Sequence, residues 1–143
     1  MSAQSANFHG LDGIEDVVAT VVRFASGGVG VHTTVLHDVL ERPSLRRLEV
    51  LCERRHIVLE NDQLGPVRWT TTGEDEVVVE GDALLAALDE RGVPRPPNPD
   101  GAFVAAVASG RPASPSFADA VRAHRVVDAI YRSAAGGGTH VDL

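Results

Sequence analysis

Residues 16–39 read DVVATVVRFASGGVGVHTTVLHDV, a pattern typical of a β-hairpin. Two runs rich in valine and threonine flank Gly27 and Gly28, and glycine takes the positive φ angles of a tight turn at no steric cost. The first run, residues 17–24, would extend over roughly 26 Å as a strand. This hairpin is the element around which we expect the rest of the chain to be organised.

Both faces of the predicted hairpin are largely apolar. Because side chains alternate along a strand, the first arm presents Val18, Thr20, Val22 and Phe24 on one face and Val17, Ala19, Val21 and Arg23 on the other. A sheet with one hydrated face alternates apolar with polar residues. We therefore expect the hairpin to be covered on both sides.

The overall composition is that of an ordinary globular protein. A chain of 143 residues predicts one domain, and 43% apolar residues are enough for a core. The net charge of −7 argues against nucleic acid as a partner, because a nucleic-acid-binding domain needs a basic face for phosphate. All 13 basic residues are arginine, so no mechanism that needs a lysine of this chain is possible.

The sequence also predicts a cytoplasmic protein that does not insert into a membrane. Cys52 is the one cysteine, which allows no internal disulfide and is consistent with a reducing compartment. No run approaches the ~18 apolar residues of a membrane helix. The first residues, MSAQSANF, lack the basic start and apolar stretch of a secretory signal.

Short β-like runs separated by turns follow the hairpin. They cover residues 45–52, 56–60, 67–72 and 77–79, and the short connections predict a mainly antiparallel sheet of about six strands. In the run 45–52, Leu48 and Val50 lie on one face, and Arg47 and Glu49 on the other. Residues 1–15 are predicted to be a tail or entry segment, and residues 16–143 a single α+β domain.

The period then changes to that of helices. Residues 82–91 have helical spacing with Asp82 as a plausible N-cap, and residues 100–109 form a second short helix. A third helix starts at Ser114 or Ser116 and runs to about residue 134. Its predicted apolar stripe is Val121, Val127, Ile130 and Ala134, and residues 139–143 could add an edge strand.

The predicted fold is therefore α+β, an open, mainly antiparallel sheet of about six strands with two to three helices packed on one face. Three helices can cover one face of such a sheet but not both. The second cover would come from a copy of the same chain or from another domain. The contact would use the Val17, Ala19, Val21 side or the Val18, Val22, Phe24 side.

The residues that could carry chemistry form no complete motif. The run Gly28-Val29-Gly30 lacks a third glycine and a following helix, so it predicts a turn and no dinucleotide site. The six histidines lack metal-ligand spacing, and we predict no metal, cofactor or catalytic residue in the chain.

Three weaker candidates remain. His37 and Asp38 lie where a strand meets a loop, so they could contact a substrate or merely cap a turn. Arginines at positions 42, 46, 47, 54 and 55 lie among glutamates, as in a self-paired surface or a site for an anionic sugar. Arg42 is the substrate-facing candidate of this group. Trp69 favours packing over a role as a ligand platform.

Several of these segments resemble one family. Four segments occur in the order seen in the C-terminal domain of the Gfo/Idh/MocA oxidoreductases, a family that includes glucose–fructose oxidoreductase and inositol dehydrogenase. They are RFASGGVG at 23–30, LEVLCERRHIVLE at 48–60, GRPASP at 110–115 followed by Asp119 and Ala120, and VVDAIYRSA at 126–134. The resemblance covers residues 13–143. It implies an open antiparallel sheet with helices on one face and a second subunit on the other.

The resemblance also implies a function that this chain does not complete. The family transfers hydride between NAD or NADP and a sugar, polyol or related molecule, using a Rossmann domain and a Glu-Lys-Pro motif, and neither is present here. The family's Asp-x-x-x-His pair has no match either, so no catalytic residue carries over. The chain resembles the truncated substrate and oligomerisation half, inactive alone, with His37, Asp38 and Arg42 near the substrate. The alternative is a stand-alone, non-catalytic, homo-oligomeric domain that binds a partner or ligand.

Overall fold

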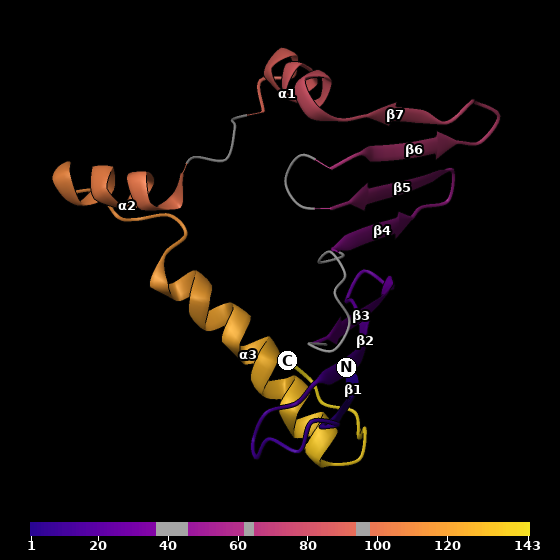
Figure 1. The fold of residues 1–143 in the computed structure, drawn as a ribbon, viewed down its shortest axis with the longest axis vertical. Coiled ribbons are helices and arrows are strands. Elements are labelled where there is room, and N and C mark those ends of the chain that lie inside the picture. The colour runs from indigo at the N-terminus through magenta and orange to yellow at the C-terminus, as the bar shows by residue number, and fades with distance from the viewer. Residues whose placement is uncertain (37–45, 62–64, 94–97) are drawn as a thin grey trace. The chain divides into compact units, whose positions relative to one another are not determined.

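The computed structural model describes residues 1–36, 46–61, 65–93 and 98–143, and these contain seven strands and three helices (Figure 1). The predicted α+β class with antiparallel pairing is confirmed. The strands form two sheets, of three and four strands, where one sheet of about six was predicted. The chain divides into two compact units, Met1–Glu41 with Phe103–Leu143 and Arg42–Ala102, where one domain was predicted.

The first unit contains the predicted hairpin and an additional strand. Strand β1 (Ser2–Ala6) pairs antiparallel with β2 (Val17–Arg23), which pairs antiparallel with β3 (Val29–Val35). Thr20 is at the centre, opposite Ala3 on one side and His32 on the other. Part of the predicted N-terminal tail is therefore the edge strand β1, which corrects the prediction for residues 1–15.

The turn between β2 and β3 depends on glycine at two positions. The Phe24 amide donates to the Gly28 carbonyl at 2.9 Å, and the Gly27 amide donates to the Phe24 carbonyl at 2.9 Å. This three-residue loop needs a left-handed residue, and Gly27 supplies it with φ +92°. At Gly30 a Cβ would lie 3.2 Å from the Phe24 ring, so glycine there allows the ring to lie against the strand.

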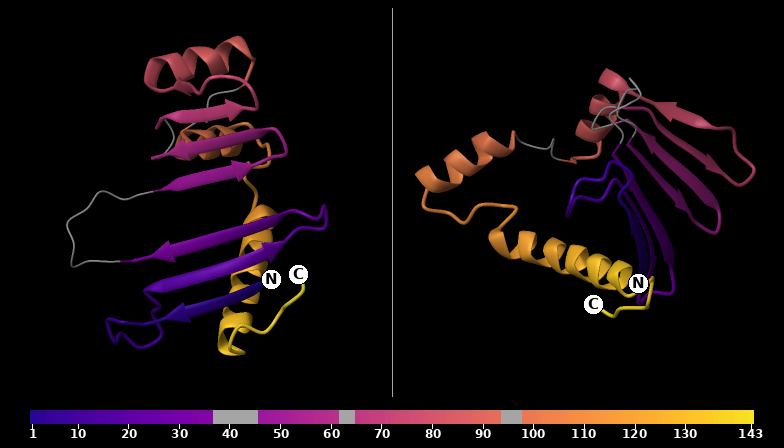
Figure 2. Two further views of the ribbon diagram at one scale, coloured as in Figure 1. Left: turned by 90° about the vertical axis from the view of Figure 1, so that its right-hand side faces the viewer. Right: turned by 60° about the horizontal axis from the view of Figure 1, so that its bottom comes forward.

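Helix α3 (Phe117–Ala135) lies against this sheet and begins at a capping box (Figure 2). Of the two candidate serines, Ser116 is the N-cap, accepting from the Asp119 amide while the Asp119 carboxylate accepts from the Ser116 amide. The most buried positions of the helix are Ala129 and Ser133. The predicted stripe is therefore only partly correct, since Ile130 and Ala134 are half-buried and Val121 and Val127 are exposed.

The C-terminal residues run beside β1 without forming the predicted strand. The Val141 amide donates to the Met1 carbonyl at 2.8 Å, and the Met1 amine donates to the Val141 carbonyl at 2.7 Å. Residues 139–143 otherwise have no regular secondary structure.

The second unit is a meander of four antiparallel strands followed by a helix. The strands β4 (Arg47–Leu51), β5 (Arg55–Glu60), β6 (Val67–Thr71) and β7 (Val77–Val79) pair in chain order. Helix α1 (Gly81–Glu90) follows in this unit. Helix α2 (Pro99–Ala108) comes next in the chain, and the boundary between the two units falls within it, after Ala102. The predicted cap is wrong, because Glu80 is the N-cap of α1 and Asp82 lies in its first turn.

The two faces of the four-stranded sheet differ in chemistry, as the alternation in residues 45–52 predicted. Leu48, Leu59, Val67 and Val79 lie opposite one another across the strands, and so do Val50, Ile57, Trp69 and Val77. Residues directly opposite share a face, so this face is apolar. The other face carries charged side chains from β4, β5 and β6.

Candidate functional site

The three substrate-facing candidates, His37, Asp38 and Arg42, lie outside the residues that the structure describes. Their role therefore stays a prediction. The described residues offer three other features, namely an apolar sheet face, a charged network and an apolar hollow.

The first feature is the exposed face of the β2–β3 hairpin. Val21 lies opposite Val31, and Val17 lies opposite Val35. Val31 is 74% exposed and Val21 is 50% exposed, and Val29 and Val35 are also exposed. Among the described residues of this unit, no element packs on these valines. We call this surface, made of Val21, Val29, Val31 and Val35, the valine face.

The opposite face of the same sheet carries the core of the unit. Thr20, Ala3, Ala129 and Ser133 are all buried there, where α3 packs against β1 beside β2. Of the two faces predicted to form an external contact, the Val18 and Val22 side is thus the one on which α3 packs. The exposed face is the one that bears Val21.

Ser133 and Thr20 are the two most completely buried polar residues of this core. The Ser133 hydroxyl accepts a hydrogen bond from the Ala3 amide at 2.8 Å and donates to the Thr139 carbonyl at 2.7 Å. It therefore joins β1, α3 and the C-terminal segment. The Thr20 hydroxyl, in a residue that is 1% exposed, has no hydrogen-bond partner among the residues that the structure describes.

Two carboxylates hold the segment before β2, a feature that the sequence did not predict. Asp16 is 6% exposed, and its carboxylate accepts from the amides of Phe8 and His9 and from the His9 ring at 2.7 Å. These hydrogen bonds, with that of the His9 ring the largest contribution, lower the pKa of Asp16. Each bond depends on the ionised carboxylate as an acceptor.

Glu15 ties the same segment to α3. The Tyr131 hydroxyl donates to the Glu15 carboxylate at 2.5 Å. This bond lowers the pKa of Glu15, and the same bond raises the pKa of Tyr131. We interpret these groups as a structural clamp that holds the segment before β2.

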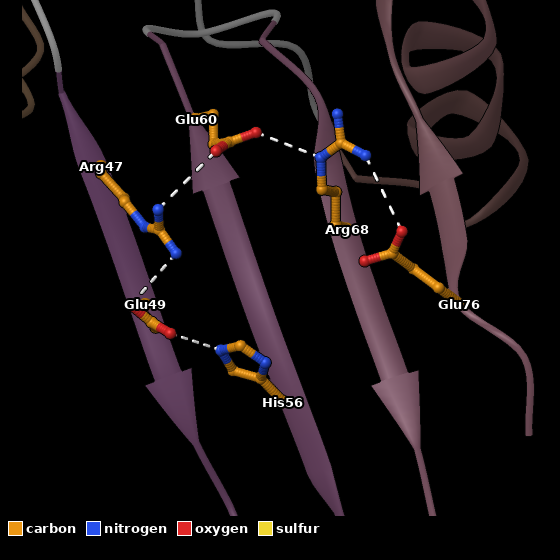
Figure 3. A network of polar contacts seen from close by, with 6 residues as sticks. All are labelled: Arg47, Glu49, His56, Glu60, Arg68 and Glu76. Carbon is orange, nitrogen blue, oxygen red and sulfur yellow. Dashed lines mark hydrogen bonds and ion pairs between the residues drawn. The ribbon is translucent and has the colours of Figure 1, made fainter. Parts of the chain in front are cut away.

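The second feature is a charged network on the polar face of the four-stranded sheet (Figure 3). Arg47 pairs with Glu49 at 3.3 Å and with Glu60 at 3.9 Å. Arg68 pairs with the same Glu60 at 3.1 Å, and the network extends to His56 and Glu76. For Arg47 this is the self-paired surface that the sequence suggested. Exposed ion pairs of this kind contribute roughly 0–1 kcal/mol each to the free energy of unfolding. We therefore interpret the network as a solvent-exposed polar surface.

The third feature is a hollow of about 360 Å³ on the apolar face of the same sheet. Trp69 lines it and is half-buried, so its predicted packing role and a ligand role are both compatible with its position. Helix α1 forms the other wall with residues at helical spacing. The remaining lining residues are Arg55, Ile57, Val67, Val79, Leu84, Ala87, Leu88 and Arg91.

The described residues also allow two plain statements about metals and membranes. Nowhere in residues 1–36, 46–61, 65–93 or 98–143 do three or more His, Cys, Asp or Glu side chains gather closely enough to hold a metal ion. Of the helices in those ranges, none combines the length and the apolar character needed to cross a bilayer. Cys52 is exposed and carries a free thiol.

Comparison with known proteins gives no relative. The chain matches no family model, no curated protein and no solved structure.

Proposed function

We propose that this chain is the C-terminal substrate-binding and oligomerisation domain of an NAD- or NADP-dependent oxidoreductase of the Gfo/Idh/MocA type. Its substrate would be a sugar, a polyol or a related small molecule, and it would contribute no catalytic residue. The proposal starts from the resemblance of residues 23–30, 48–60 and 110–134. The α+β architecture with antiparallel pairing is compatible with it. A cytoplasmic location belongs to the same proposal.

The observation that carries the oligomerisation role is the valine face. The four valines together expose the equivalent of about two fully exposed valine side chains. Burying them would contribute roughly 3–6 kcal/mol for each copy, at ~1.5–3 kcal/mol per side chain. Two copies would thus gain about as much as the ~4–15 kcal/mol cost of association. We therefore expect a homodimer whose population depends on protein concentration.

Light scattering with size-exclusion chromatography tests this role. Val31→Asp and Val21→Asp should each shift the dimer to monomer while the far-UV circular dichroism is retained, because a buried unpaired charge is costly at a contact. Val78→Asp is the matched control, since Val78 is also a strand valine, is 44% exposed, and belongs to the other sheet. A wild-type chain that stays monomeric at millimolar concentration would reject the oligomerisation role.

A second experiment tests the enzymatic part of the proposal. The isolated chain should neither turn over a polyol panel with NAD or NADP nor bind either nucleotide tightly. Turnover would reject the assignment of this chain as the non-catalytic half. The DNA immediately upstream of codon one separates the two functions: an in-frame Rossmann sequence supports the oxidoreductase, whereas a native promoter and stop support the stand-alone, non-catalytic binding domain.

A further inference from the structure

We propose that the hollow in the second unit binds a small amphipathic anion, namely a medium-length aliphatic carboxylate. This inference concerns residues 55–91 and is independent of the valine face. It begins from a difference between the arginines on the two faces of one sheet.

On the charged face, the described carboxylates neutralise the arginines. Arg47 pairs with two glutamates, and Arg68 pairs with two. On the apolar side, Arg55 of β5 and Arg91, the C-cap residue of α1, line the hollow, and neither forms an ion pair within the described part of the chain. Although the chain has a net charge of −7, the two guanidinium groups at this hollow have no carboxylate partner among the described residues.

The Arg55 guanidinium is held in place by its own neighbour. Its Nε donates to the Thr71 hydroxyl at 3.2 Å, across the β5–β6 pair. This bond uses one of the five N–H donors and leaves the terminal NH₂ groups available. A carboxylate is the acceptor whose geometry such a planar group matches best.

The walls of the hollow specify the other end of the ligand. Apart from the two arginines, every lining residue is apolar, with Ile57, Trp69 and Leu88 as the larger members. A volume of about 360 Å³ holds about a dozen non-hydrogen atoms at roughly 30 Å³ each. Sugar hydroxyls would find almost no partners on these walls, and burying unpaired hydroxyls is costly. An aliphatic chain has no polar group to desolvate there, and its carboxylate would accept hydrogen bonds from the guanidinium groups.

The test uses Trp69, the one tryptophan of the chain, as an internal reporter. The full chain is titrated with octanoate, with octan-1-ol and with octyltrimethylammonium, and the intrinsic fluorescence is followed. We expect a saturable change with octanoate, and binding at least tenfold weaker for the alcohol and the cation. Charge-assisted hydrogen bonds to guanidinium account for a ratio of about 10 to 100.

Two variants separate the charge from the cavity. Arg55→Gln with Arg91→Gln should weaken octanoate binding about tenfold or more and leave octanol binding unchanged, whereas Arg54→Gln, next along the chain and outside the lining, should change neither. Ala87→Leu should weaken both ligands by filling the hollow. Circular dichroism confirms that each variant is folded.

Three results would overturn the proposal. One is equal binding of octanoate and octanol, and another is an unchanged octanoate affinity in the double variant. The third is a Trp69 signal that changes with protein concentration but not with octanoate, which would mean that a second copy covers the hollow.

Discussion

The Ser133 hydroxyl should contribute measurably to the stability of the first unit. In Ser133→Ala the Ala3 amide loses its acceptor inside the core, since Ala3 and Ser133 are both buried. A buried donor that is left without an acceptor lowers the free energy of unfolding by about 1–3 kcal/mol. The Thr139 carbonyl also loses its donor, but this bond is only partly buried, so water can replace it at a cost of about 0.5 kcal/mol.

The helix itself gains from the same substitution. Alanine is a better helix former than serine by roughly 0.5 kcal/mol. The net expected loss is therefore about 2 kcal/mol, which corresponds to an opening equilibrium about 30 times larger, at 1.4 kcal/mol per factor of ten. Hydrogen exchange of peptides covering residues 2–6 should accelerate by that factor.

The control and the refutation use another serine. Ser109→Ala removes a hydroxyl that donates to the Ala105 carbonyl at 2.7 Å in the exposed turn directly after α2, so its effect should remain within about 0.5 kcal/mol. If Ser133→Ala accelerates exchange at residues 2–6 less than threefold, the hydroxyl does not hold β1 to α3. The burial argument would then be wrong.

Three further predictions concern the same unit. Thr20→Val removes, at nearly constant volume, a buried hydroxyl for which the described residues offer no partner, so the free energy of unfolding in urea should rise by about 1 kcal/mol. A decrease would mean that the hydroxyl is hydrogen-bonded in solution. Because the pKa of Asp16 is lowered, its carboxylate stabilises the fold above the ordinary value near 3.9 and loses this effect as the pH falls through the lowered pKa. Asp16→Asn should therefore be less stable at pH 7, and its free energy of unfolding in urea should fall less steeply as the pH is lowered. An unchanged dependence on pH would contradict the role of Asp16 in the clamp. Because the pKa of Tyr131 is raised, its protonated hydroxyl stabilises the fold below about pH 10, and this stabilisation is lost as the pH rises through the raised value. Tyr131→Phe should therefore make the free energy of unfolding depend less steeply on pH in the alkaline range. A dependence as steep as that of the wild type would mean that another group causes the alkaline loss of stability.

Local patterns predicted the elements whose cause is local. The two-glycine turn gave the hairpin, because Gly27 alone supplies the left-handed residue that the loop needs. The Ser116 and Asp119 pair gave the start of α3 through a capping box whose partners are three residues apart. Alternation gave the faces of β4, because one of its faces is charged.

Strand β1 could not be predicted, because its cause is not local. Its sequence, SAQSA, contains no β-branched or aromatic residue. It is a strand because it pairs with β2 and because the Ala3 amide reaches Ser133, 130 residues along the chain. The division into two sheets was missed for a related reason, since the alternation within a strand does not say which edges pair.

The choice of covered face in the hairpin shows the same limit most sharply. Both faces of β2 carry valines, so hydrophobicity did not distinguish the Val21 side from the Val22 side. The small side chains Ala3, Ala129 and Ser133 decide it, because they allow α3 to approach the sheet closely enough to bury Thr20. Ala129 and Ser133 are four residues apart and therefore lie on one helix face. A search for small residues at this spacing, and not for large apolar ones, is what would have indicated the packed side and left the valine face as the exposed one.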